Sequence, residues 1–194
     1  MSHTPLHTAL SEVLALLRGV HWNAWVTHWK SAGTEAYSDH LLFQRLYEGS
    51  GGGPDIANQI DGLGERMIAL FGQGGVDAVA VQERSATLLQ GVLELPPIER
   101  ALKLEALLLL ELTRAVHLCE KTDLALDNFL RTVADERSTV VYLLQQRRKT
   151  DTGSGYGDVP TGTGSSGFLL VLGTLAVAYG LHAMTSGPQA AQEY

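Results

Sequence analysis

Apolar side chains recur at alternating steps of three and four residues from Pro5 to about Gly33. This spacing places them along one face of an α-helix and predicts a first helix of roughly 20 residues or more. Two histidines near its end fall on the same seam and are expected to face the interior. The seam comprises His7, Leu10, Leu14, Leu17, His21, Ala24 and His28.

The helical period continues through the next 120 residues, and strand-like alternation is nearly absent. A second helical pattern begins near Thr34, is interrupted by the run Gly49–Pro54, and resumes at Asp55. A short helix is expected around residues 77–92. Two further long helices are expected, one opened by Pro96 and Pro97 and one from Thr122 or Asp123 to about Lys149.

The remaining residues differ in composition. Residues 151–167 contain six glycines and little that could pack, which predicts a flexible linker. Residues 168–184 are uncharged and apolar. We therefore expect a helical bundle over residues 1–149, a Gly-rich linker over 150–167, and an apolar C-terminal helix with a polar end over 168–194. The apolar helix could pack on the bundle or meet its own copies; a membrane anchor and a docking peptide are the alternatives.

Four long amphipathic helices with a long connection in the middle predict an all-α fold of the ferritin type, a four-helix bundle with one crossover.

The net charge of −7 and the pI near 5.4 argue against DNA binding, because phosphate contacts need clustered cations. The one basic cluster, residues 147–149, ends a helix and complements its dipole. A single cysteine, Cys119, and an N-terminus without the pattern of a signal peptide favour the cytoplasm.

Several side chains suited to metal binding lie at helical spacings. His28 is on the first seam, His40 lies one turn before Gln44, and Asp61 lies one turn before Glu65. Imidazole and carboxylate ligands without thiolate suit iron, manganese or zinc. Taken singly, each histidine is more often a core or interface residue than a ligand, and the acidic pair is more often a solvated helix face.

The ordered series of these residues resembles the Dps family of mini-ferritins, including distant members from bacteriophages. It is carried by Trp25 to Lys30, Gly33, Tyr37, His40, Phe43, Leu46, Tyr47, and Ile60 to Arg66. The resemblance implies an inter-subunit iron site in a homo-oligomer, with His28 and His40 from one chain and Asp61 and Glu65 from its two-fold mate. It also implies that Fe(II) is oxidised there and stored as ferric iron in a hollow shell, with no catalytic residues apart from the metal site.

Three departures from the family leave a second reading open, a structural protein with this fold and no ferroxidase turnover. Gln44 stands where the family has an acidic residue, residues 49–54 split a helix that is normally continuous, and a lysine-rich DNA-binding tail is missing. An intrasubunit di-iron site is disfavoured because no histidine follows a glutamate by three residues. A nucleotide loop at Gly162–Gly167 is disfavoured because no strand precedes it.

Overall fold

The computed structural model describes residues 4–48, 55–119 and 123–151, and these residues contain helices and no strand. The helices are α1 (Pro5–Lys30), α2 (Ala36–Glu48), α3 (Ile56–Phe71), the short 3-10 helix η2 (Gln73–Gly75), α4 (Ala78–Gln90), α5 (Pro97–Cys119) and α6 (Leu124–Asp151). All of them belong to one compact unit. The expected linker and apolar C-terminal helix lie outside the described residues.

Local sequence signals set the ends of these helices. The side chains of Thr4, Asp55 and Asp77 each accept a hydrogen bond from a main-chain N–H in the first turn of α1, α3 and α4. Pro97 occupies the first position of α5, where its missing N–H costs nothing. Gly72 ends α3 with a φ of 78°, a conformation that favours glycine. The helices predicted within residues 5–149 are thus confirmed, and the second helical pattern is divided into α2 and α3.

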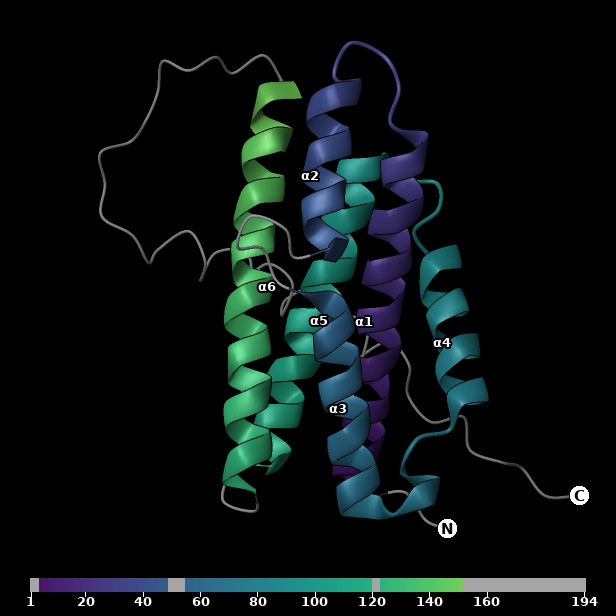
Figure 1. Ribbon diagram of the computed structural model, residues 1–194, viewed down its shortest axis with the longest axis vertical. Helices are drawn as coiled ribbons and strands as arrows, with labels where there is room; N and C mark the ends of the chain where they lie inside the picture. The colour runs from purple at the N-terminus through teal and green to yellow at the C-terminus, as the bar shows by residue number, and fades with distance from the viewer. Residues whose placement is uncertain (1–3, 49–54, 120–122, 152–194) are drawn as a thin grey trace, which may run out of the picture. The chain divides into compact units, whose positions relative to one another are not determined.

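The bundle consists of α1, α5, α6, and a fourth position shared by α2 and α3 (Figure 1). Helix α1 packs against α5 and also contacts α2, α3 and α4. The short helix α4 belongs to the long connection between α3 and α5 and lies beside α1 (Figure 1). The break at residues 49–54 therefore falls between two helices that pack on the same neighbour.

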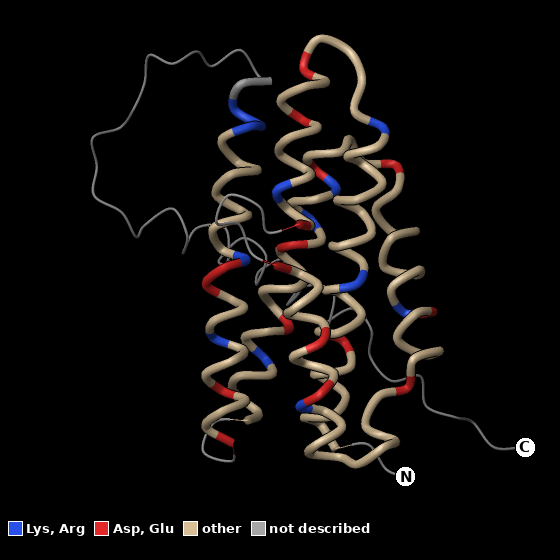
Figure 2. Tube along the Cα trace, viewed as in Figure 1, with Lys and Arg blue, Asp and Glu red and all other residues tan. Residues whose placement is uncertain are grey.

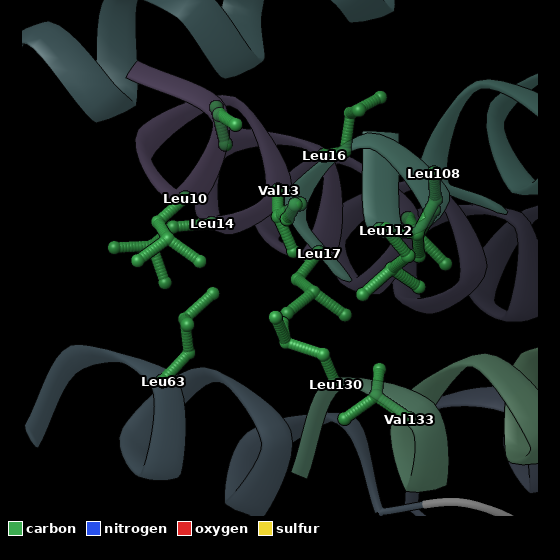
Figure 3. Packing of buried hydrophobic residues seen from close by; sticks show 14 of the residues in the cluster. Leu10, Val13, Leu14, Leu16, Leu17, Leu63, Leu108, Leu112, Leu130 and Val133 are labelled. Carbon is green, nitrogen blue, oxygen red and sulfur yellow. The ribbon is translucent and has the colours of Figure 1, made fainter. Parts of the chain in front are cut away.

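The apolar core is divided into two clusters along the bundle. The larger one joins α1, α3, α5 and α6, and Figure 3 shows its side chains converging from these helices. Its members include Leu10, Leu14, Leu17, Leu63, Leu108, Leu112, Leu130 and Val133. The smaller one lies where α2 packs, and comprises Ala24, Phe43, Leu46, Ile98, Ala101, Val140 and Leu144.

A buried ion pair lies between the two clusters. Glu105 of α5 and Arg137 of α6 are 1% and 0% exposed, and their closest charged atoms, Oε1 and Nη1, are 3.4 Å apart. None of the three guanidinium nitrogens makes a hydrogen bond, and neither does Glu105 Oε2. The sequence pattern treats Glu105 as a polar interruption of the apolar run in α5, whereas the structure places it in the core.

Lys and Arg are interspersed with Asp and Glu along the described helices (Figure 2). Within the basic cluster that ends α6, Arg147 contacts Asp39 at 2.7 Å and Arg148 contacts Glu99 at 3.6 Å. Arg147 and Arg148 thereby link the end of α6 to α2 and α5. None of the described helices combines the length and the apolar character needed to cross a bilayer.

Candidate metal centre

His28 and His40 lie face to face, although they belong to different helices. The turn after α1 reverses the chain through Gly33, which has a φ of 91°, and α2 then runs back along α1. The two imidazole rings are 3.7 Å apart between centroids, with 31° between their planes. The two histidines expected to share a site are therefore brought together within one chain.

Reciprocal hydrogen bonds hold the two rings. Nδ1 of His28 lies 3.1 Å from the main-chain oxygen of His40, and Nδ1 of His40 lies 3.3 Å from the main-chain oxygen of His28. A carbonyl oxygen can only accept, so each Nδ1 carries the proton. In the neutral ring, Nε2 is then the nitrogen with the free lone pair. Histidine ligands of metals are commonly oriented in this way by a main-chain carbonyl.

An aromatic cluster lies beside the histidine pair. The ring of Tyr47 meets His28 edge to face at 5.4 Å, and it also approaches His21 and Trp25. Burial raises the pKa of the Tyr47 hydroxyl, and the neighbouring Glu48 carboxylate raises it further. Burial lowers the pKa of His21 and Arg18 lowers it further, while Asp55 opposes the shift. Tyr47 therefore stays protonated, and His21 favours its neutral form.

Gln44 lies one turn after His40, where a carboxylate would be expected from the resemblance. Its amide nitrogen donates to Oε2 of Glu48 at 2.9 Å. The nearest carboxylate on this face of α2 is thus that of Glu48, two turns after His40, and it accepts a hydrogen bond from the Gln44 amide. Asp39, a second acidic residue near the histidines, forms an ion pair with Arg147.

The acidic pair lies on a separate surface of the same chain. Asp61 and Glu65 are exposed on α3, one turn apart. Two adjoining cavities of about 480 and 380 Å³ form a groove between α3 and α4, with α1 as its floor. Asp61 and Arg18 line both cavities, and Glu65 lines the second.

Arg66, the last residue of the acidic motif, points to α6 and away from that groove. Its guanidinium donates to the main-chain oxygen of Gly62 at 2.7 Å and lies 4.2 Å from the ring centre of Phe129. This cation–π contact holds the Arg66 side chain against α6. Arg66 therefore leaves the Asp61 and Glu65 carboxylates available.

The described part of one chain does not complete a metal site. Within it, no group of three or more His, Cys, Asp or Glu side chains is placed to hold one ion. The histidine pair and the acidic pair are thus two separate clusters of potential ligands. Arg18 and Glu48, which lie beside these clusters, were not predicted from the sequence, and Tyr47 was noted only as part of the resemblance. Only the one-turn spacing from Gln44 to Glu48 offered a signal.

Comparison with known proteins defines the fold. No protein-family model and no curated protein matches the sequence. The structure is similar to that of Dps from Thermosynechococcus elongatus, with a TM-score of 0.61 and 20% identity over 81% of this chain and 94% of that one. It is also similar to Dps92 from Deinococcus radiodurans, with a TM-score of 0.55 and 20% identity over 73% and 84% of the two chains. The expectation of a Dps-type ferritin-like fold is confirmed.

Proposed function

We propose that this protein is a homo-oligomer that binds iron between two subunits related by a two-fold axis. His28 and His40 of one chain are the nitrogen ligands, and Asp61 and Glu65 of its mate are the oxygen ligands. Iron is the substrate of the site. Fe(II) binds there, gives an electron to dioxygen or peroxide, and is stored as ferric iron in a closed shell.

The arrangement of the histidine pair carries this proposal. Two imidazoles from different helices have their Nδ1 atoms fixed on carbonyl oxygens 3.1 and 3.3 Å away, which leaves both Nε2 lone pairs for a cation. A core histidine would instead use both nitrogens for internal hydrogen bonds. Two neutral ligands are too few for a stable iron site, so carboxylates must come from elsewhere.

The surface of α1 supports pairing with a second copy. Trp22 and Trp29 are 48% and 57% exposed and contact each other edge to face at 6.2 Å. An exposed aromatic ridge of this kind is typical of an interface. We place this aromatic surface of each chain, whose Trp22 also lines the α3–α4 groove, against the same surface of its mate, as a two-fold contact allows. His28 then approaches the carboxylates of Asp61 and Glu65.

One observation favours a second function, binding and assembly without turnover. Gln44 supplies a neutral amide where a carboxylate would stabilise Fe(III), and that amide is bound to Glu48. A site with fewer anionic ligands holds the ferric product less tightly. In this case Fe(II) binds and the oligomer forms, but the oxidation rate stays at that of iron in buffer.

Absorbance of ferric iron after Fe(II) addition tests the proposal. The wild-type chain should oxidise Fe(II) faster than buffer, and the variant His28→Ala with Glu65→Ala should not. His117→Ala, which removes an exposed histidine of α5, is the matched control and should keep the wild-type rate. Equal rates for the wild type and the double variant would refute turnover. Anaerobic Fe(II) titration of the same proteins then decides whether binding remains.

A further inference from the structure

A third cavity lies at the far end of α4, separate from the histidine pair. It has a volume of about 460 Å³ and is enclosed by α1, the end of α4, and the start of α5. This volume falls in the range of small-molecule sites, roughly 300–1,000 Å³. None of His28, His40, Asp61 and Glu65 lines it.

Two polar side chains of α1 line this cavity with their hydrogen-bonding capacity unused. Asn23 and Thr27 are 6% and 7% exposed and lie one turn apart. Neither side chain makes a hydrogen bond to another described residue. By contrast, the hydroxyl of Thr132 on α6 donates to the main-chain oxygen of Asn128. The amide of Asn23 and the hydroxyl of Thr27 are therefore available to a polar molecule in the cavity.

The opposite wall of the cavity is apolar. Leu89 at the end of α4, Leu93 in the following turn, and Val26 of α1 contribute to it. Leu93 is 54% exposed, so much of its apolar surface is open to a molecule in the cavity. A ligand with a hydrocarbon portion would cover these side chains while its polar end meets Asn23 and Thr27.

Cationic groups lie at one end of the cavity. Lys30 and Arg100 both line it, and Arg100 follows the positive N-terminus of α5 closely. Nε of Arg100 is buried without a hydrogen-bond partner, and its Nη1 makes only a 3.5 Å contact with the Leu93 oxygen. The acidic residue at this rim, Asp39, is already neutralised by Arg147 at 2.7 Å. The local charge therefore favours an anion.

We propose that this cavity binds a small amphipathic carboxylate. The carboxylate lies between Lys30 and Arg100 and hydrogen-bonds with Asn23 and Thr27, and the hydrocarbon portion packs on Leu89 and Leu93. None of the four proposed iron ligands lines this cavity, although Trp22 of the proposed subunit interface does.

The test uses 2-naphthoate as the probe and isothermal titration calorimetry on the full chain in its native assembly. The wild type should bind one naphthoate per chain, saturably. Asn23→Leu with Thr27→Val should weaken binding about tenfold or more, because two hydrogen bonds are lost. The matched pair Asn128→Leu with Thr132→Val, at the same spacing on α6, should leave the affinity unchanged.

A second variant keeps the test decisive if the α1 variant fails to fold. Arg100→Gln should weaken naphthoate binding several-fold and leave binding of the neutral analogue 2-naphthalenemethanol unchanged. Absence of saturable naphthoate binding by the folded wild type would overturn the proposal. So would equal affinity of wild type and both cavity variants, since the probe would then bind elsewhere.

Discussion

Nδ1 of His28 donates to the main-chain oxygen of His40, and Nδ1 of His40 donates to the main-chain oxygen of His28. These two hydrogen bonds join the end of α1 to the first half of α2. It also decides the tautomer of both rings, because each bond requires the proton on Nδ1. The orientation that exposes two Nε2 lone pairs is thus built into the packing of α2 on α1.

Replacing either histidine should weaken metal binding. His28→Gln or His40→Gln removes one nitrogen ligand and one orienting bond, and each should reduce Co(II) affinity by about 10–100-fold, the usual effect of disturbing a ligand and its support. Calorimetric Co(II) titration of the oligomer measures this. His117→Gln is the control. A variant that retained wild-type affinity would remove that histidine from the ligand set.

Moving the carboxylate by one turn should strengthen the site. The double variant Gln44→Glu with Glu48→Gln keeps the net charge and the hydrogen bond between the two positions, but places the anion one turn from His40. Fe(III) is stabilised by an anionic oxygen ligand, so the rate of Fe(II) oxidation should rise several-fold. Stopped-flow absorbance measures it. Gln146→Glu, on the exposed face of α6, should have no effect, and a swap variant no faster than wild type would contradict this role of position 44.

Removing one member of the Glu105–Arg137 pair should destabilise the protein, whereas replacing both by apolar residues should not. Arg137→Met alone leaves a carboxylate buried without its partner and should lower the free energy of unfolding by about 3–5 kcal/mol. The double variant Glu105→Leu with Arg137→Met should be neutral or more stable by about 1–4 kcal/mol. Urea unfolding measures both. Arg131→Met, which breaks an exposed pair with Asp127, should cost less than about 1 kcal/mol; a double variant as unstable as the single one would contradict the account.

The same pair should give the protein an unusual pH dependence. Burial raises the pKa of Glu105 above its usual value near 4.5, and Arg137 only partly offsets this. Between the usual and the raised pKa the folded state holds a proton that the unfolded state has lost, so this residue's contribution to stability falls as pH rises through that window. The difference in unfolding free energy between wild type and Glu105→Gln, measured by urea titration at several pH values, should fall accordingly. A difference that is constant or rises with pH would contradict the shift.

The helices could be predicted because their signals are local. The seam of α1 and the proline that opens α5 depend on neighbours a few residues apart. The ion pair could not be predicted, because its two members are 32 positions apart in the sequence and each is ordinarily a surface residue. The helical period did place Arg137 on the inward line of Val133 and Val140, but residue type argued the other way. Burial of a charge depends on a partner that only the fold brings near.

In the candidate site, too, the local features could be predicted and the long-range contacts could not. The one-turn spacing of Asp61 and Glu65 could be read from the sequence, and so could the place of His28 on one face of α1 with Leu17 and Ala24. The structure leaves His28 only partly buried, because that face is less covered toward the end of α1. The contact of His28 with His40 depends on the turn at Gly33 and on the packing of α2, which the spacing alone does not determine. That the histidine pair of one subunit meets the acidic pair of another stays a prediction, since it concerns two chains.

Subunit complementation tests that central claim most directly. One chain carries His28→Ala with His40→Ala, and the other carries Asp61→Ala with Glu65→Ala. Neither should bind Fe(II) at this site when it assembles alone. When the two are unfolded, mixed and refolded together, each mixed pair contains one complete site, so anaerobic Fe(II) titration should recover tight binding at one site per mixed dimer. If the mixed oligomer binds no more Fe(II) than its two parents, the site does not lie between subunits and the account is wrong.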